Sequence, residues 1–185
     1  MFSPDGEYVE DVFDPSGQEI LPTIALRQSE RALKVDPGAA DAEHARGLAL
    51  ARLGRREAAL AAFRAATQLD ADNPWPWFDL GRTALALDRP AVAVTAFRRA
   101  AASIGERASA ARLLAWSVRA AVAAGDGAAA DALRAEARAK DPQLIDGLVR
   151  AVTDAEDEAR DEALALVEAV APGTQIPRRL PVIPH

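Results

Sequence analysis

The sequence repeats itself with a period of 34 residues. When the chain is shifted by that length, residues 62–66 (AFRAA) fall on residues 96–100 (AFRRA), and Gly47 falls on Gly81. Each copy holds two segments of about 12–14 residues in which apolar residues recur every three or four positions. Glycine or aspartate separates the two segments, at Gly54, Asp88 and Gly125. A tandem repeat of paired amphipathic helices favours a stacked helical array, because one pair buries too little apolar surface to fold alone.

The composition agrees with close-packed helices. The chain has 45 alanines among 185 residues, and only 5% of its residues are aromatic. Alanine is the best helix former, and its small side chain lets helix axes approach each other. A β-sandwich or barrel needs more aromatic and β-branched residues, so we expect an all-α fold.

The repeats resemble the tetratricopeptide repeat (TPR) family at their small and aromatic positions. In residues 40–73 the matching positions are Gly47, Gly54, Ala59, Phe63, Ala66 and Asp70, and in residues 74–107 they are Trp77, Leu80, Gly81, Ala93, Phe97 and Ala100. The resemblance implies a right-handed α-solenoid of antiparallel helix hairpins. It also implies that Trp77 is a structural residue of its repeat.

The expected domain is a repeat array over residues 23–171, with units at about 23–39, 40–73, 74–107, 111–144 and 145–171. A three-residue insertion near residues 108–110 interrupts the period. The acidic helix around residues 154–170 is predicted to cap the array, with Leu164, Leu166, Val167 and Val170 inward and its carboxylates outward. Residues 1–22 are predicted to form an acidic arm or small hairpin. The proline-rich residues 172–185 are predicted to form an extended tail.

Several function classes are disfavoured. The net charge is −6, which argues against nucleic-acid binding. There is no cysteine, and the two histidines, His44 and His185, are far apart, so we expect no metal site and no cofactor. Motifs for a catalytic serine elbow, a phosphate loop or a zinc helix are absent, and we expect no enzyme activity. Without a signal peptide or a long apolar run, the chain is expected to be cytoplasmic, with no membrane insertion, and its Ala/Arg-rich composition suggests a bacterial source.

The TPR resemblance implies a concave groove lined by the first helix of each repeat. Carrying the groove positions of the family over to this chain, and adding a nearby tryptophan, gives the candidate binding residues His44, Leu48, Trp75, Phe78, Arg82, Leu85, Arg112, Trp116 and Arg119. Aromatic side chains with arginines beside them suit a peptide that carries apolar anchors and an acidic group. The carboxylate clamp of some TPR proteins is not expected, because its Lys and Asn positions hold His44, Leu48 and Asp79 here.

The predicted function is a non-catalytic adaptor or scaffold that binds a peptide segment of a partner protein in this groove. The alternative is a structural or regulatory subunit of a larger assembly, including a homo-oligomer. In that case Trp75, Phe78 and Trp116 are covered by the arm or tail of the chain, by a second subunit or by a permanent partner.

Overall fold

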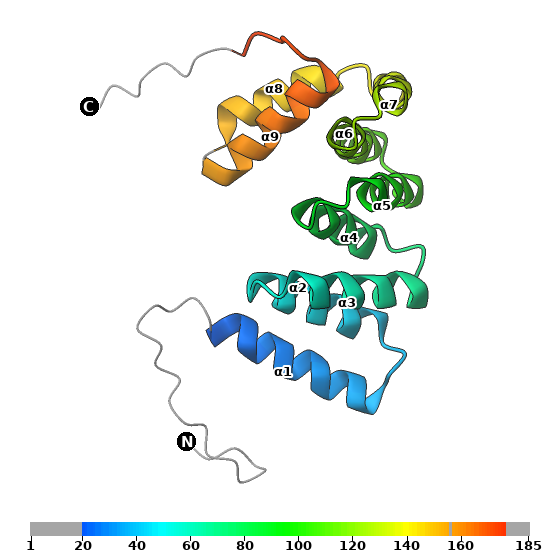
Figure 1. The fold of residues 1–185 in the computed structure, drawn as a ribbon, viewed down its shortest axis with the longest axis vertical. Helices are drawn as coiled ribbons and strands as arrows, with labels where there is room; N and C mark the ends of the chain where they lie inside the picture. Colours follow the sequence, from blue (N-terminus) through cyan, green and yellow to red (C-terminus); the bar gives the residue numbers. More distant parts are fainter. Residues whose placement is uncertain (1–19, 156, 177–185) are drawn as a thin grey trace, which may run out of the picture. The chain divides into compact units, whose positions relative to one another are not determined.

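The structure is a computed structural model that describes residues 20–155 and 157–176. In these ranges it contains the helices α1 to α9 and no β-strand (Figure 1). The predicted all-α helical-repeat fold is confirmed. The chain divides into two compact units, residues 1–71 and residues 72–185. None of the described helices is long and apolar enough to cross a membrane.

The first unit contains α1 (Ile20–Val35), α2 (Ala40–Arg52) and α3 (Arg56–Leu69). Helix α2 packs against both α1 and α3. Helix α1 begins at Ile20, so residues 20–22 are helical, although the sequence analysis assigned them to the arm. The rest of the predicted arm, residues 1–19, lies outside the described residues.

The second unit contains three helix pairs. These are α4 (Pro74–Ala86) with α5 (Pro90–Ser103), α6 (Arg107–Ala123) with α7 (Gly127–Lys140), and α8 (Leu144–Asp154) with α9 (Asp157–Val170). Helix α5 packs against α6, which joins the first two pairs. Residues 172–176, the start of the predicted tail, are not helical, and residues 177–185 lie outside the described part of the chain.

Three of the turns between paired helices contain one residue in the left-handed backbone region. Gly54, Asp88 and Gly125 fill this place, with φ values of 72°, 55° and 72°. Glycine adopts this conformation without steric cost, and aspartate tolerates it better than most residues. The glycines and the aspartate that the sequence analysis read as helix breaks therefore lie at equivalent positions of three turns.

Two glycines let the helices of a pair approach closely. A Cβ atom on Gly47 of α2 would lie 2.5 Å from the Phe63 ring of α3, and one on Gly81 of α4 would lie 2.6 Å from the Phe97 ring of α5. Both rings are fully buried. The glycine and the phenylalanine thus share one space, and this explains why the two residue types recur together with the 34-residue period.

The insertion near residues 108–110 lengthens one helix. Helix α6 starts at Arg107 and, at 17 residues, is longer than any other described helix. The Glu106 side chain caps it by accepting hydrogen bonds from the backbone N–H groups of Ala108 (3.2 Å) and Ser109 (3.0 Å). The extra residues thus extend the N-terminal end of the first helix of the third pair.

The α8–α9 hairpin packs against α6, and α9 makes the larger part of this contact. Leu166, Val167 and Val170 are buried as predicted, and Leu164 is half-buried. The prediction that all carboxylates of the acidic helix face outward is wrong for Glu162. This carboxylate lies 3.3 Å from the guanidinium group of Arg82 on α4. The acidic helix therefore faces the arginine-bearing side of α4 and α6.

Candidate functional site

An aromatic cluster lies where α4, α5 and α6 meet. The ring of Phe78 is 5.8 Å from the Phe97 ring and 5.7 Å from the Trp116 ring, measured between centroids, and Phe97 and Trp116 are 5.4 Å apart. Trp116 is only 5% exposed and Phe97 is fully buried, whereas Phe78 is half-buried. Tilted and edge-to-face rings at these distances attract each other, so the cluster forms a rigid apolar floor.

Two arginines lie over this floor. The guanidinium carbon of Arg119 is 5.0 Å from the centroid of the Trp116 ring, and that of Arg82 is 5.9 Å from the same centroid. Arg82 also lies 5.8 Å from the centroid of Phe78. Each cation is held by the negative face of an aromatic ring. The arginines that the sequence analysis placed beside aromatic residues are thus fixed there by cation–π contacts.

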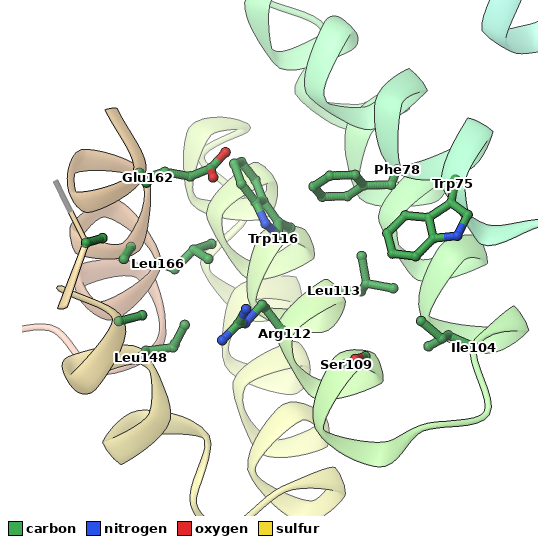
Figure 2. Close-up of a pocket in the computed structure, with 14 residues that line it drawn as sticks. Trp75, Phe78, Ile104, Ser109, Arg112, Leu113, Trp116, Leu148, Glu162 and Leu166 are labelled. Atoms are coloured by element: carbon green, nitrogen blue, oxygen red, sulfur yellow. The ribbon is translucent and has the colours of Figure 1, made fainter. Parts of the chain in front are cut away.

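The α8–α9 hairpin encloses an apolar pocket against these helices. We call it the aromatic pocket, and its volume is about 400 Å³. Figure 2 shows Trp75 and Phe78 on one side, Leu148, Glu162 and Leu166 of the hairpin on the other, and α6 between them. The remaining labelled lining residues are Ile104, Ser109, Arg112, Leu113 and Trp116. Such a pocket, mostly apolar with a few polar groups, is the usual form of a binding site.

A second opening lies beside the first, and we call it the charged cleft. Its volume is about 380 Å³, and it brings two arginines of α4 and α6 to three carboxylates of α9. Its lining residues are Arg82, Leu85, Ala86, Trp116, Arg119, Glu158, Asp161 and Glu162. Because Trp116 and Glu162 line both openings, the aromatic pocket and the charged cleft are neighbours within the second unit, and we treat them together as the candidate site.

Most of the predicted binding residues lie at this site. Trp75, Phe78, Arg112 and Trp116 line the aromatic pocket, and Arg82, Leu85 and Arg119 line the charged cleft. Trp75 is 55% exposed although it is a large aromatic side chain.

Two predicted residues lie elsewhere, in the first unit. His44 and Leu48 are half-buried on α2, and the His44 ring is 5.8 Å from the buried Phe63 ring. Trp77, expected to be structural, is half-buried. No described group of three or more His, Asp or Glu side chains is arranged to hold a metal ion.

The sequence analysis missed the contribution of the hairpin. Leu148, Glu162 and Leu166 form one wall of the aromatic pocket, and none of them was a candidate. The sequence did contain a signal for this contact, because the acidic run of α9 and the arginines of α4 and α6 carry opposite charges. Charge complementarity between these distant segments could have paired them.

The comparisons with known proteins agree with the fold. A family model described as a tetratricopeptide repeat matches residues 40–73. A crystal structure of MamA superposes with a TM-score of 0.59 at 18% identity, covering 86% of this chain and 94% of that chain. The crystal structure of YrrB, described as a TPR protein with an unusual peptide-binding site, gives a TM-score of 0.57 at 20% identity, with 83% and 79% covered. No curated protein sequence matches this chain.

Identities this low show that this chain shares its fold with the two solved proteins, and they show nothing further. The repeat match and the fold nevertheless agree with the helix pairs, the glycine–phenylalanine contacts and the turn residues described above. Residues 40–73 match a tetratricopeptide repeat, and the described part of the chain has the helical-repeat fold of these solved structures.

Proposed function

We propose that this protein is a non-catalytic adaptor that binds a peptide segment of a partner protein at the aromatic pocket and the charged cleft. The observation that carries the proposal is the exposed indole of Trp75 at the edge of an apolar pocket of about 400 Å³. A large aromatic group left in water beside a rigid apolar floor is a typical anchor point of an interface. The TPR fold is itself an interaction scaffold, and YrrB, which shares the fold, is described as having a peptide-binding site.

The charges support a peptide that carries an acidic group. Arg112 lines the aromatic pocket and is exposed, and among the described residues no carboxylate lies within salt-bridge distance of it. An arginine can bind a carboxylate through two parallel hydrogen bonds. A peptide with an apolar anchor for the pocket and an Asp or Glu for Arg112 would satisfy both features.

A random-peptide display library tests this proposal. Peptides enriched on the wild-type protein would be labelled with fluorescein, and their dissociation constants measured by fluorescence polarisation. Trp75→Ala and Arg112→Glu should each weaken binding by about tenfold or more, since removal of a central interface anchor costs about 2 kcal/mol. Val122→Ala and Arg99→Glu are matched controls, because they change an exposed apolar residue and an exposed arginine outside both openings. Enriched peptides that bind both site variants as tightly as the wild type would refute the proposal.

The second candidate function is that of a structural or regulatory subunit whose site is permanently filled. The burial of Trp116 favours it, because the α8–α9 hairpin already covers part of the face that was expected to be open. Size-exclusion chromatography with light scattering separates the two functions. A stable homo-oligomer would support the structural role, and a monomer that captures peptides would support the adaptor.

A further inference from the structure

Helix α9 lies against the other helices of the second unit in the way that a bound helical ligand would. Its acidic residues Glu158, Asp161 and Glu162 line the charged cleft opposite Arg82 and Arg119. An apolar row of side chains runs beside this acidic row on the same side of the helix. The apolar row that lines the aromatic pocket is Ala159, Ala163 and Leu166. Residues three and four apart share one face of a helix, so α9 is an acidic amphipathic helix laid on an aromatic, arginine-bearing surface.

The polar part of this contact is exposed to water, whereas Leu166 and Val170 of α9 are buried. The Arg82 and Glu162 side chains, 3.3 Å apart, remain 46% and 35% exposed, so water and salt screen their attraction. The aromatic pocket, about 400 Å³ in volume, lies open between the hairpin and α6, so the hairpin does not cover the whole of this surface.

The C-terminal end of α9 is attached by hydrogen bonds to its backbone. Arg134 of α7 donates a hydrogen bond to the carbonyl oxygen of Ala169 (2.7 Å), and Arg138 donates one to that of Val170 (3.0 Å). These bonds satisfy carbonyl groups in the last turn of the helix. Helix α8 also starts close to the end of α7, at Leu144 after Lys140. The start of α8 and the end of α9 are therefore both linked to α7, while α9 packs against α6.

From this arrangement we propose that α9 is an internal copy of the ligand, and that the partner segment is an acidic amphipathic helix that displaces α9 and binds the α4 and α6 walls of the aromatic pocket and the charged cleft. The inference rests on the proposed function for the existence of a partner. Opening the hairpin exposes Leu148 and Leu166, so the closed form predominates when no partner is bound. The partner must compete with the hairpin, and its apparent affinity is reduced by the small fraction of open molecules.

The opening can be measured without any partner, because the chain contains no cysteine. Nitroxide labels on Val122→Cys in α6 and Asp154→Cys in α8, both exposed, report the distance between the hairpin and α6 by pulsed electron paramagnetic resonance. Glu162→Arg places a third positive charge beside Arg82 and Arg119. It should raise the ratio of open to closed molecules by about five- to tenfold. Raised salt should reduce this difference between Glu162→Arg and the wild type.

The matched control is Glu168→Arg, the same charge change at an exposed site of α9 that lines neither opening. It should leave the distance distribution of the wild type unchanged. Equal distributions for Glu162→Arg and the wild type, or equal opening in Glu168→Arg, would overturn the proposal. Circular dichroism of all variants checks that helicity is retained.

Competition is tested with a fluorescein-labelled peptide of residues 157–170 added to the full-length protein. The Glu162→Arg protein should bind this probe about five- to tenfold more tightly than the wild type, because its own α9 competes less well. Adding Arg82→Glu and Arg119→Glu to that protein should abolish binding of the probe. Probe affinity that does not change with Glu162→Arg would overturn the inference.

The two proposals fail in different ways. If library peptides bind through Trp75 and Arg112 but the α9 probe does not bind, the adaptor function stands and the internal-ligand inference falls. If no library peptide binds although the hairpin opens and the probe competes, the proposed function falls.

Discussion

The contact between Gly81 and Phe97 gives a sharp test of the repeat packing. In Gly81→Ala the new methyl carbon would stand 2.6 Å from Cε1 and 2.8 Å from Cδ1 of the Phe97 ring. Ordinary contacts begin at about 3.4 Å, so the ring or the helix must move by almost an ångström. Phe97 is fully buried and lies against Phe78 and Trp116, so a shift of its ring disturbs these neighbours.

The expected effect is the difference between two terms. Alanine in place of glycine stabilises a helix interior by about 1 kcal/mol. Overpacking in a filled core costs about 1–3 kcal/mol. We therefore expect Gly81→Ala to lower the free energy of unfolding by up to about 2 kcal/mol, because the cost of overpacking offsets or exceeds the gain in helix propensity. The double variant with Phe97→Leu should show a smaller cost of the added methyl group, since the two positions share one space.

Urea unfolding followed by tryptophan fluorescence is the appropriate assay. All three tryptophans of the chain, Trp75, Trp77 and Trp116, lie in the second unit, so the signal reports on the unit that holds Gly81. The control is Gly147→Ala in α8, where an added Cβ meets nothing within 4 Å. It should raise stability by up to about 1 kcal/mol. If Gly81→Ala proves as stable as Gly147→Ala, the close approach of α4 and α5 is wrong.

Substitutions at three further positions test the helix ends, each by urea unfolding. Gly125→Ala should cost about 1–2 kcal/mol because φ is 72° there, and Gly125→Asn should cost less; equal stability of the alanine variant and the wild type would contradict the left-handed turn. Asp126→Ala should cost about 1 kcal/mol by removing the 2.9 Å hydrogen bond that the Ala129 N–H donates to this side chain, whereas no loss would refute the cap. Hydrogen bonds from the side chain and the backbone of Ser109 lower the pKa of Glu106 from its usual 4.5, so the stability due to this carboxylate is present above that pH and is lost as the pH falls through the lowered value. The stability difference between the wild type and Glu106→Gln should therefore shrink as the pH falls below 4.5, and a difference that does not change with pH would refute this coupling.

The sequence predicted the paired helices well because their main determinants are local. The spacing of apolar residues, the turn residues and the shared Gly–Phe space recur with one period in the first two repeats. In the third pair two residues differ from this pattern, and the two changes in side-chain size compensate each other. Val118 is fully buried at the position equivalent to Gly81, and Arg134 replaces the aromatic residue equivalent to Phe97. A larger side chain on α6 thus accompanies the loss of the ring on α7, and the two helices still pack as a pair.

The position of the last pair could not be predicted in the same way. The acidic run of α9 has the same appearance in sequence whether it faces water or two arginines, because a helix pattern shows which residues share a face and not what that face contacts. What decides the position is chemistry on other helices. Arg134, where a ring was expected, binds a carbonyl group of α9, and Arg82, expected to await an acidic partner, binds Glu162. Arg134, which departs from the repeat pattern, and Arg82, which was expected to face an open groove, therefore both hold the hairpin at the proposed binding surface.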